Sequence, residues 1–339
     1  MMKKPAVVIT DYVEENLAWE IEQLSGIAEL RIYQERFAPP DRLMSLVRDA
    51  RIVIVNMARI SAEIIESMDH CGLIIRHGIG YDNVDIKAAA SSGIPVVNIP
   101  DYCIDEVAEQ TVMLMLASAR RLKEQMETVR NSAGGRGWES TGIPRISRIT
   151  GKTLGILGFG RVGRRVAELC AGFGLNILAC DPHIPPDTLP PGVKAVSLDE
   201  AVSESDFLCV TAILNPETRH LVDRRIFGNM KSEAFLINTS RGGVVDQEAL
   251  AEALHTGLIA GAATDVYEDG EPPDGTNPLL NCPRIIMTPH YSWASVEAEA
   301  DIRQKIVRLV TDFIQSGKMG NVVNMPAKHR AVHQQQLPD

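Results

Sequence analysis

Short apolar segments recur along the chain and alternate with longer segments whose apolar residues follow a helical period. In the first hundred residues, four such segments are strand-length and rich in β-branched side chains: residues 7–9, 52–55, 73–75 and 96–99. Because parallel strands buried on both faces have continuous apolar sequences, this alternation predicts βαβ units that form a parallel sheet.

A second series of strand-length apolar segments begins at residue 153. Its members are residues 153–157, 176–180, 194–196, 207–211, 235–238, 260–265 and 284–288. These segments are enough for a complete doubly wound sheet, so the sequence predicts an α/β protein with two Rossmann-like domains.

The segments around the two series have patterns of their own. Residues 105–130 predict one long helix, and residues 294–316 predict a final helix. Residues 131–151 contain five glycines and a proline, which indicates an ordered arm or linker. The tail at residues 331–339 has no apolar periodicity and is predicted to be disordered.

Composition narrows the classes of function. The chain has 339 residues, 45% of them hydrophobic, and its formal net charge of −10 argues against a nucleic-acid-binding protein. No apolar run reaches the roughly 18 residues that span a membrane. The six cysteines form no C-x-x-C pair, so we expect no metal site and a cytoplasmic protein.

The sequence GILGFGRVG at residues 155–163 predicts a dinucleotide-binding loop between a strand and a helix. Gly158 permits the tight turn, Gly160 lets the backbone approach the pyrophosphate, and Gly163 lets the helix pack against the strand. The helix N-terminus attracts the same anion. An ordinary turn between a strand and a helix is the alternative. We expect the cofactor contacts of this loop to come from Gly158, Phe159, Gly160, Arg161, Val162 and Gly163.

Asp181 closes the next predicted strand, 23 residues after Gly158. A carboxylate at this position accepts hydrogen bonds from the ribose hydroxyls of NAD and repels the 2′-phosphate of NADP, which would need an arginine. Pro182 and His183 follow it instead. The sequence therefore favours NAD.

Polar residues follow several strands of the second series, at the sheet edge where open parallel sheets bind ligands. Arg241 and His290 come soon after two of these strands, and Glu271 follows a third. An arginine can hold a carboxylate with two hydrogen bonds, and a histidine oriented by a carboxylate can exchange a proton with a carbonyl. These three residues suit hydride transfer to a 2-keto acid.

Each of the three also has an interpretation that the sequence leaves open. Arg241 could cap local structure or pair with Asp265. His290 could be a structural histidine with a satisfied ring. Glu268 competes with Glu271 as the carboxylate that orients His290.

Four segments together resemble the D-2-hydroxyacid dehydrogenase family over nearly the whole chain. They are RHGIGYDNVD at residues 76–85, the glycine loop, NTSRGGVVD at residues 238–246 and Thr-Pro-His at residues 288–290. Within the family, the chain is most similar to the C-terminal-binding-protein and phosphoglycerate-dehydrogenase-like group, because it shares the H-x-x-W pattern of residues 290–293 and the sequence leading into the glycine loop.

The resemblance implies that Arg241, Glu271 and His290 are catalytic. It implies substrate contacts from Arg76, Gly78, Ile79, Gly80 and Trp293. Beyond the glycine loop and Asp181, it places near the cofactor Thr211, Asn215, Thr218, Thr239 and Asp265. One departure concerns the glutamate, because the segment between Asp265 and Glu271 is one residue longer than in the most similar sequences.

The resemblance also implies a domain layout. A discontinuous substrate domain of residues 1–103 and 294–330 would enclose an NAD domain of residues 104–293. The resemblance implies a homodimer that acts on a small 2-keto or 2-hydroxy acid, and we expect no nucleic-acid or membrane partner.

Two other functions stay open. One is a 3-phosphoglycerate dehydrogenase, for which Arg59 is the nearest candidate phosphate ligand; we expect no room for the C-terminal domain of its long, feedback-regulated form. The other is an NAD-sensing, corepressor-like protein that binds peptide partners, which the H-x-x-W pattern motivates.

Overall fold

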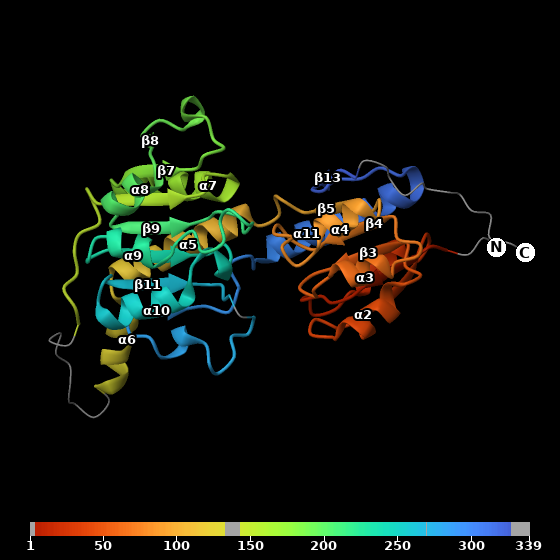
Figure 1. Ribbon diagram of the computed structural model, residues 1–339, viewed down its shortest axis with the longest axis horizontal. Coiled ribbons are helices and arrows are strands. Elements are labelled where there is room, and N and C mark those ends of the chain that lie inside the picture. Colours follow the sequence, from red (N-terminus) through yellow and green to blue (C-terminus); the bar gives the residue numbers. More distant parts are fainter. Residues whose placement is uncertain (1–3, 133–142, 269, 327–339) are drawn as a thin grey trace, which may run out of the picture. The chain divides into compact units, whose positions relative to one another are not determined.

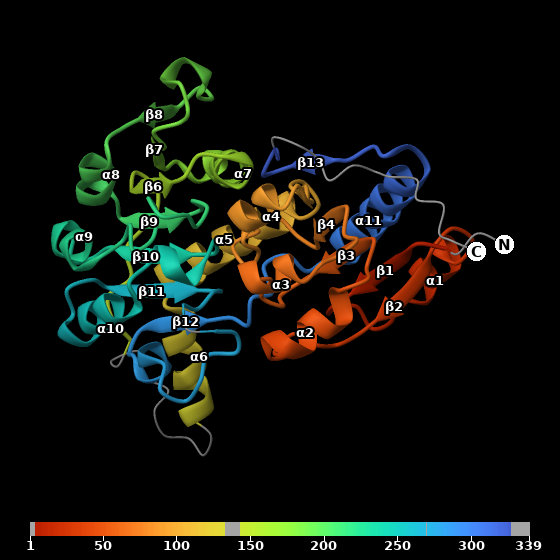
Figure 2. The ribbon, with the colours of Figure 1, turned by 45° about the vertical axis from the view of Figure 1, so that its right-hand side comes forward.

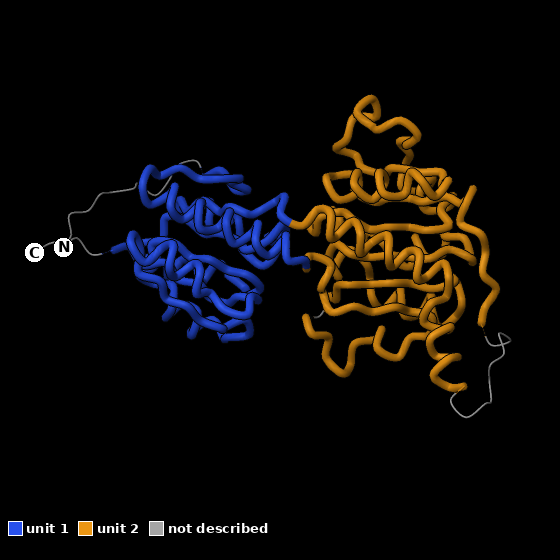
Figure 3. The backbone as a smooth tube through the Cα atoms, turned by 180° about the vertical axis from the view of Figure 1, so that it is seen from behind, with its two compact units in different colours: residues 1–102, 295–339 blue, residues 103–294 orange. Residues whose placement is uncertain are grey.

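The computed structural model describes residues 4–132, 143–268 and 270–326. The chain forms two compact units, unit 1 of Met1–Tyr102 and Ser295–Asp339 and unit 2 of Cys103–Ala294 (Figure 3). Each unit has a mainly parallel sheet with helices on both faces, so the predicted α/β class is confirmed.

Unit 1 has a six-stranded sheet in the order β13-β5-β4-β3-β1-β2 (Figure 1). Its strands are β1 (Ala6–Ile9), β2 (Glu29–Ile32), β3 (Ile52–Val55), β4 (Leu73–Arg76), β5 (Val96–Asn98) and β13 (Asn321–Val322). Its helices are α1 (Ala18–Leu24), α2 (Pro40–Val47), α3 (Ala62–Glu66), α4 (Ile86–Ser91) and α11 (Val296–Ser316). The strand order reverses between β1 and β3, which is the point where open α/β sheets bind ligands.

The sequence pattern does not predict two strands of this sheet. The edge strand β2 is only half-buried and carries the charged residues Glu29 and Arg31, so it lacks a continuous apolar run. β13 has only two residues and pairs antiparallel with β5. The sheet of unit 1 is therefore not wholly parallel, because the returning chain adds an antiparallel strand at its edge.

The core of unit 1 lies on both faces of the sheet. In β3, Val53 and Val55 pack with residues of α2 and α3, and Ile52 and Ile54 pack with residues of α1 and α11. The four residues of β3 are at most 2% exposed. A strand covered on both faces leaves only its carboxyl end for polar groups, so chemistry is confined to the loops there.

Unit 2 has a seven-stranded parallel sheet in the order β12-β11-β10-β9-β6-β7-β8 (Figure 2). Its strands are β6 (Thr153–Leu157), β7 (Asn176–Cys180), β8 (Val193–Ala195), β9 (Phe207–Val210), β10 (Phe235–Asn238), β11 (Gly261–Thr264) and β12 (Ile285–Met287). Its α-helices are α5 (Ile104–Ala119), α6 (Leu122–Asn131), α7 (Arg161–Cys170), α8 (Leu198–Glu204), α9 (Arg224–Asn229) and α10 (Gln247–Thr256). The order reverses between β6 and β9, so the loops after these two strands flank the expected dinucleotide crevice.

The single long helix predicted at residues 105–130 is wrong. The structure divides it into α5 and α6 at Arg121, which adopts a left-handed conformation with φ of 54°. The guanidinium of Arg121 lies 4.7 Å from the centre of the Phe235 ring and donates a hydrogen bond to the carbonyl oxygen of Ala260 at 2.9 Å. These tertiary contacts favour a break that helical periodicity does not reveal.

Two predicted features fall partly or wholly outside the described residues. Residues 133–142 of the expected arm and the tail at residues 331–339 are among those the structure does not describe. Within the described ranges, no helix is both long enough and apolar enough to cross a membrane. The same ranges contain no cluster of three or more side chains suited to a metal ion.

Candidate active site

The glycine loop between β6 and α7 owes its shape to three glycines. Gly158 has φ of 88°, and a Cβ there would lie 2.5 Å from the Cα of Ala212. A Cβ on Gly163 would lie 2.4 Å from the carbonyl oxygen of Gly158. Gly160 is exposed, and a Cβ there would meet open space. Two glycines thus serve protein packing, and the space in front of the third suits a bound pyrophosphate.

The carboxylate of Asp181 lies against this loop. One oxygen accepts a hydrogen bond from the backbone N–H of Phe159 at 2.8 Å, and the other accepts one from the N–H of His183 at 2.9 Å. The Phe159 side chain is fully buried, so only its backbone faces the loop. Arg161 is exposed at the first turn of α7, and Val162 is half-buried. These groups fit a dinucleotide, with the helix N-terminus facing the anion and a carboxylate one strand away.

The hydroxyl and amide residues expected near the cofactor also hold the loops in place. Thr211, directly after β9, donates a hydrogen bond to the carbonyl oxygen of Gly158 at 2.6 Å and so joins the two strands at the reversal point. Asn215 accepts hydrogen bonds from the N–H groups of Glu217 and Thr218, at 2.8 and 3.0 Å. Thr239 is buried, with its hydroxyl 2.6 Å from that of Thr111 in α5.

His290 is hydrogen-bonded to Glu271. The ring Nδ1 of His290 donates to the Glu271 carboxylate, and the two side chains are 24% and 13% exposed. Glu268, the competing carboxylate, instead lies 2.5 Å from the ring of His220 and 3.1 Å from the guanidinium of Arg219. The structure therefore brings Glu271, and not Glu268, to His290.

Asp265 lies at the end of β11, and its side chain anchors the loop that carries His290. Its buried carboxylate accepts hydrogen bonds from the hydroxyls of Thr288 and Ser292. It also accepts hydrogen bonds from the N–H groups of Tyr291 and Ser292, at 3.1 and 2.9 Å. These four hydrogen bonds hold residues 288–292 in place. The sequence analysis did not predict a role for the hydroxyls of Thr288 and Ser292.

Tyr267 fixes the same loop from the other side. Burial, together with the negative charges of Asp265 and Glu271, raises the pKa of Tyr267 to about 12. The protonated hydroxyl donates a hydrogen bond to the carbonyl oxygen of Thr288 at 2.8 Å. The backbone N–H of Tyr267 donates a hydrogen bond to the other carboxylate oxygen of Glu271 at 3.3 Å. Tyr267 is therefore hydrogen-bonded both to Glu271 and to the loop that carries His290.

Arg241 reaches this edge because two backbones approach closely beside it. It precedes a short 3-10 helix, Gly242–Val244, at the end of β10. A Cβ on Gly242 would lie 2.0 Å from the carbonyl carbon of Tyr267 and 2.3 Å from the backbone nitrogen of Glu268. Half-buried Arg241 donates a hydrogen bond to the carbonyl oxygen of Ser240 at 2.9 Å. Arginine, glutamate and histidine thus come from adjacent strand ends.

Arg76 ends β4 in unit 1 and is buried, at 6% exposed. Its guanidinium donates a hydrogen bond to the carbonyl oxygen of His77 at 2.6 Å. Gly78 has φ of 143°, which strains any residue with a side chain, and a Cβ there would lie 1.5 Å from the same guanidinium. Ile79 and Gly80 are half-buried, and Asn98 donates to the carbonyl oxygen of Ile79 at 2.6 Å.

Two further residues come from the segments that carry the family resemblance. Asn83, within the RHGIGYDNVD segment, donates hydrogen bonds to the carbonyl oxygens of Asn56 and Ala58 at 3.1 and 2.9 Å, so part of that motif is structural. Trp293 in unit 2 is half-buried and meets the ring of Tyr291 edge to face, with centroids 5.8 Å apart.

The family description "D-isomer specific 2-hydroxyacid dehydrogenase, NAD binding domain" matches residues 112–292, which is more than half of the chain. The chain belongs to this family. The predicted family and an NAD-binding domain are thereby confirmed. A hydroxypyruvate reductase of Thermotoga maritima is 34% identical over 88% of this chain and 96% of its own length.

Two other members show how the fold and the length compare. A D-lactate dehydrogenase of Aquifex aeolicus, solved with NAD and lactic acid, has a TM-score of 0.83 and 28% identity over 95% of this chain and 100% of its own. A D-3-phosphoglycerate dehydrogenase of Methanocaldococcus jannaschii is 33% identical over 94% of this chain, which spans only 59% of that protein's length.

Proposed function

We propose that the chain is an NAD-dependent D-2-hydroxyacid dehydrogenase that transfers a hydride between NAD(H) and a small 2-keto or 2-hydroxy acid. The observation that carries this proposal is the hydrogen bond between His290 and Glu271, on the strand-end edge where Arg241 also lies. During reduction of a 2-keto acid, a histidine oriented by a carboxylate can donate the proton, and a nearby arginine can bind the substrate carboxylate.

The three residues have separate tasks in this mechanism. Glu271 binds Nδ1 of His290, fixes the ring orientation and stabilises the imidazolium, which leaves Nε2 to exchange a proton with the substrate oxygen. Arg241 binds the substrate carboxylate and polarises the carbonyl. The nicotinamide, when bound, supplies or accepts the hydride.

The cofactor contacts follow from the glycine loop. The backbone at Gly160 and the first turn of α7 would hold the pyrophosphate, because open space faces Gly160 and the helix N-terminus attracts an anion. Asp181 would accept the ribose hydroxyls. Two backbone N–H groups fix its carboxylate, so it cannot turn away from a 2′-phosphate, and NAD is preferred to NADP.

In unit 1, we assign further contacts with the substrate carboxylate to Arg76 and the backbone of residues 78–80, which makes this unit the substrate domain and unit 2 the NAD domain. Trp293 would contact the substrate side chain and favour a modest apolar group such as a methyl or thioether.

Arg59 is exposed and is the candidate phosphate ligand for the alternative substrate, 3-phosphoglycerate. The intact His290–Glu271 pair argues against peptide binding as the main role.

We further propose a cytoplasmic homodimer. The six cysteines carry thiols rather than disulfides, as expected in a reducing compartment.

Helices α5 and α6 expose Met113, Leu122, Met126 and Val129, which are 44–56% exposed. A shallow apolar groove beside them is lined by Val112, Leu116, Ala117 and Leu169. Apolar surface of this kind on a folded unit is suited to a second copy of the chain.

The proposal is tested by NADH oxidation with a panel of pyruvate-like, apolar and phosphorylated 2-keto acids. We expect turnover with a small keto acid, and a higher kcat/KM with NADH than with NADPH. His290→Asn should lower kcat by roughly 10²- to 10⁴-fold, which is the usual contribution of a general acid. The binding of NADH, followed by fluorescence titration, should stay nearly unchanged.

His220→Asn is the matched control. His220 also pairs with a glutamate and, like His290, has a positive φ, which asparagine tolerates, so both variants make the same change in similar surroundings. Retained turnover in His290→Asn, or loss of activity in His220→Asn alone, would contradict the assigned role. A chain that binds NADH but reduces no keto acid in the panel would refute the dehydrogenase proposal.

A further inference from the structure

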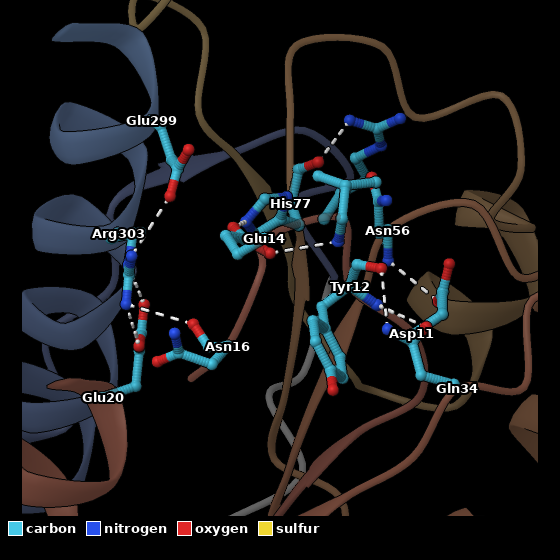
Figure 4. Close-up of polar contacts among 12 residues, drawn as sticks. Asp11, Tyr12, Glu14, Asn16, Glu20, Gln34, Asn56, His77, Glu299 and Arg303 are labelled. Atoms are coloured by element: carbon cyan, nitrogen blue, oxygen red, sulfur yellow. Dashed lines mark hydrogen bonds and ion pairs between the residues drawn. The ribbon is translucent and has the colours of Figure 1, made fainter. Parts of the chain in front are cut away.

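A buried ion pair lies beside Arg76 at the point where the strand order of unit 1 reverses. His77 directly follows β4, and its Nε2 lies 2.7 Å from a carboxylate oxygen of Glu14, which belongs to the loop after β1. The two side chains are 10% and 2% exposed (Figure 4). A carboxylate is costly to bury unless it is hydrogen-bonded, so a buried glutamate–histidine pair at a ligand-binding edge points to a role beyond packing.

The Glu14–His77 pair is connected to Arg76 through the backbone of His77. The carbonyl oxygen that accepts the Arg76 guanidinium at 2.6 Å belongs to His77 itself. Gly78 follows at once, with φ of 143°, and a Cβ there would clash with the same guanidinium. A shift of the His77 side chain therefore shifts both the acceptor of Arg76 and the glycine beneath it.

A second carboxylate in the loop after β1 holds a backbone segment that also contacts Arg76. Asp11 accepts hydrogen bonds from the N–H groups of Asn56, Met57 and Ala58, at 3.2, 2.6 and 3.2 Å. The sulfur of Met57 lies 3.8 Å from the guanidinium of Arg76. Residues 11–14 thus hold the loops after both β3 and β4, between which the arginine side chain lies.

We propose that Glu14 and His77 are positioning residues that hold Arg76 and residues 78–80 in the geometry that binds the substrate carboxylate. The pair belongs to unit 1, whereas His290 and Glu271 belong to unit 2, so we expect it to act on substrate affinity and not on the proton or hydride step. This inference rests on the proposed function, because it takes the assignment of Arg76 to the substrate carboxylate from there.

Unit 1 offers a matched control for a purely stabilising role. Glu20 of α1 is also buried, with its side chain 6% exposed, and it pairs with Arg303 of α11 at 2.5 and 2.8 Å. Figure 4 shows this pair together with the Glu14–His77 pair. Among the described residues, the Glu20 carboxylate is hydrogen-bonded to Arg303 and forms no hydrogen bond or ion pair with the loops after β3 and β4.

The test compares Glu14→Ala, Glu14→Gln and Glu20→Ala in the full-length chain. Because small displacements of a binding group are costly, Glu14→Ala should raise KM for the keto acid by about 10- to 100-fold while kcat at saturation changes less than about twofold. Glu14→Gln keeps a hydrogen-bond acceptor for His77, so its KM should be intermediate. Glu20→Ala should lower the unfolding temperature and leave KM unchanged.

Direct binding supplies a measurement that does not depend on turnover. Oxalate, added to the complex with NAD⁺ in a calorimeter, should bind Glu14→Ala about tenfold more weakly than the unchanged chain. Equal KM and oxalate affinity in the Glu14 and Glu20 variants would overturn the inference, as would a change confined to kcat. If Glu14→Ala fails to fold, Glu14→Gln decides by the same two measurements.

The two proposals fail in different ways. An unmodified chain that reduces no keto acid contradicts the dehydrogenase function. An active chain whose Glu14 variants keep their KM contradicts only the positioning role.

Discussion

At the scale of single residues, most polar side chains at the strand ends of unit 2 bind other parts of the protein. Thr211 is hydrogen-bonded to the glycine loop, Asp265 to the segment after β12, and Tyr267 to the carbonyl oxygen of Thr288. These bonds keep the neighbouring loops fixed before any ligand arrives. In the proposed mechanism, such preorganisation would let His290 and Arg241 act without a reorganisation cost during the reaction.

The acid sensitivity of unit 1 should depend on Glu14. Burial alone would raise the pKa of this carboxyl, but the hydrogen bond and positive charge of His77 lower it from 4.5 to about 2. Because the folded-state pKa is depressed, the stabilisation is complete above the unfolded value and is lost as the pH falls from about 4.5 towards 2. The shift corresponds to at most about 3 kcal/mol.

Urea unfolding as a function of pH measures this effect. The difference in unfolding free energy between the unmodified chain and Glu14→Gln should be largest above about pH 5 and should shrink towards pH 2. A difference that stays constant over that range would show that protonation of Glu14 does not contribute to acid unfolding.

The sequence predicts residues with a strong chemical signature better than residues that support them. Arg241, Glu271 and His290 are identifiable because charged groups after apolar strands are conspicuous. Glu14 and Asp11 follow β1 in the same way, and a search of the strand ends of the first series would have found them. Their partners would have stayed unknown, because hydrogen bonds to backbone groups leave no mark in a sequence.

At the scale of elements, close approach between backbones decides where the catalytic loops lie. Gly242→Ala should push the 3-10 helix after β10 away from residues 267–268, because all three atoms that the new Cβ would meet most closely are backbone atoms. We expect a loss of about 2 kcal/mol in unfolding free energy and a fall of about 100-fold in kcat/KM. Chemical unfolding and steady-state kinetics measure the two effects.

Gly228→Ala provides the control for that substitution. Gly228 lies within α9, and a Cβ there would meet nothing within 4 Å. Alanine also has the higher helix propensity, so this variant should keep full activity and equal or slightly higher stability. Normal activity in Gly242→Ala would show that the close approach is not needed for catalysis.

Periodicity predicts the central strands well and the edges poorly. The bounds expected for β6, β7 and β10 match the structure residue for residue, since each mainly apolar run stops at a glycine or a polar residue. β2 and β13 are not predicted, because an edge strand needs only one buried face and two residues carry no period. The break between α5 and α6 depends on Phe235 and Ala260, far away in the sequence, so no local pattern reveals it.

At the scale of the whole molecule, the apolar surface of α5 and α6 bears on assembly. If it is the dimer interface, Met113→Asp should place a charge in a desolvated contact and weaken association by roughly 30-fold or more, or about 2 kcal/mol. Light scattering after size-exclusion chromatography at several concentrations measures the molar mass. The expected result is a shift from dimer to monomer.

Phe37→Asp serves as the comparison, because Phe37 is 72% exposed in unit 1 and lies on neither helix. This variant should keep the molar mass of the unmodified chain. A dimer that survives Met113→Asp, or a chain that is monomeric throughout, would exclude this surface as the interface.

The hydrogen bonds that Asp11 accepts from three successive backbone N–H groups have a consequence for evolution. They fix the course of residues 56–58 without using any side chain of that segment. Substitutions at Met57 can therefore alter the chemical character of the surface beside Arg76 while the loop keeps its path. A lineage descended from this protein could acquire a new substrate through changes in these few positions and inherit its catalytic residues unchanged.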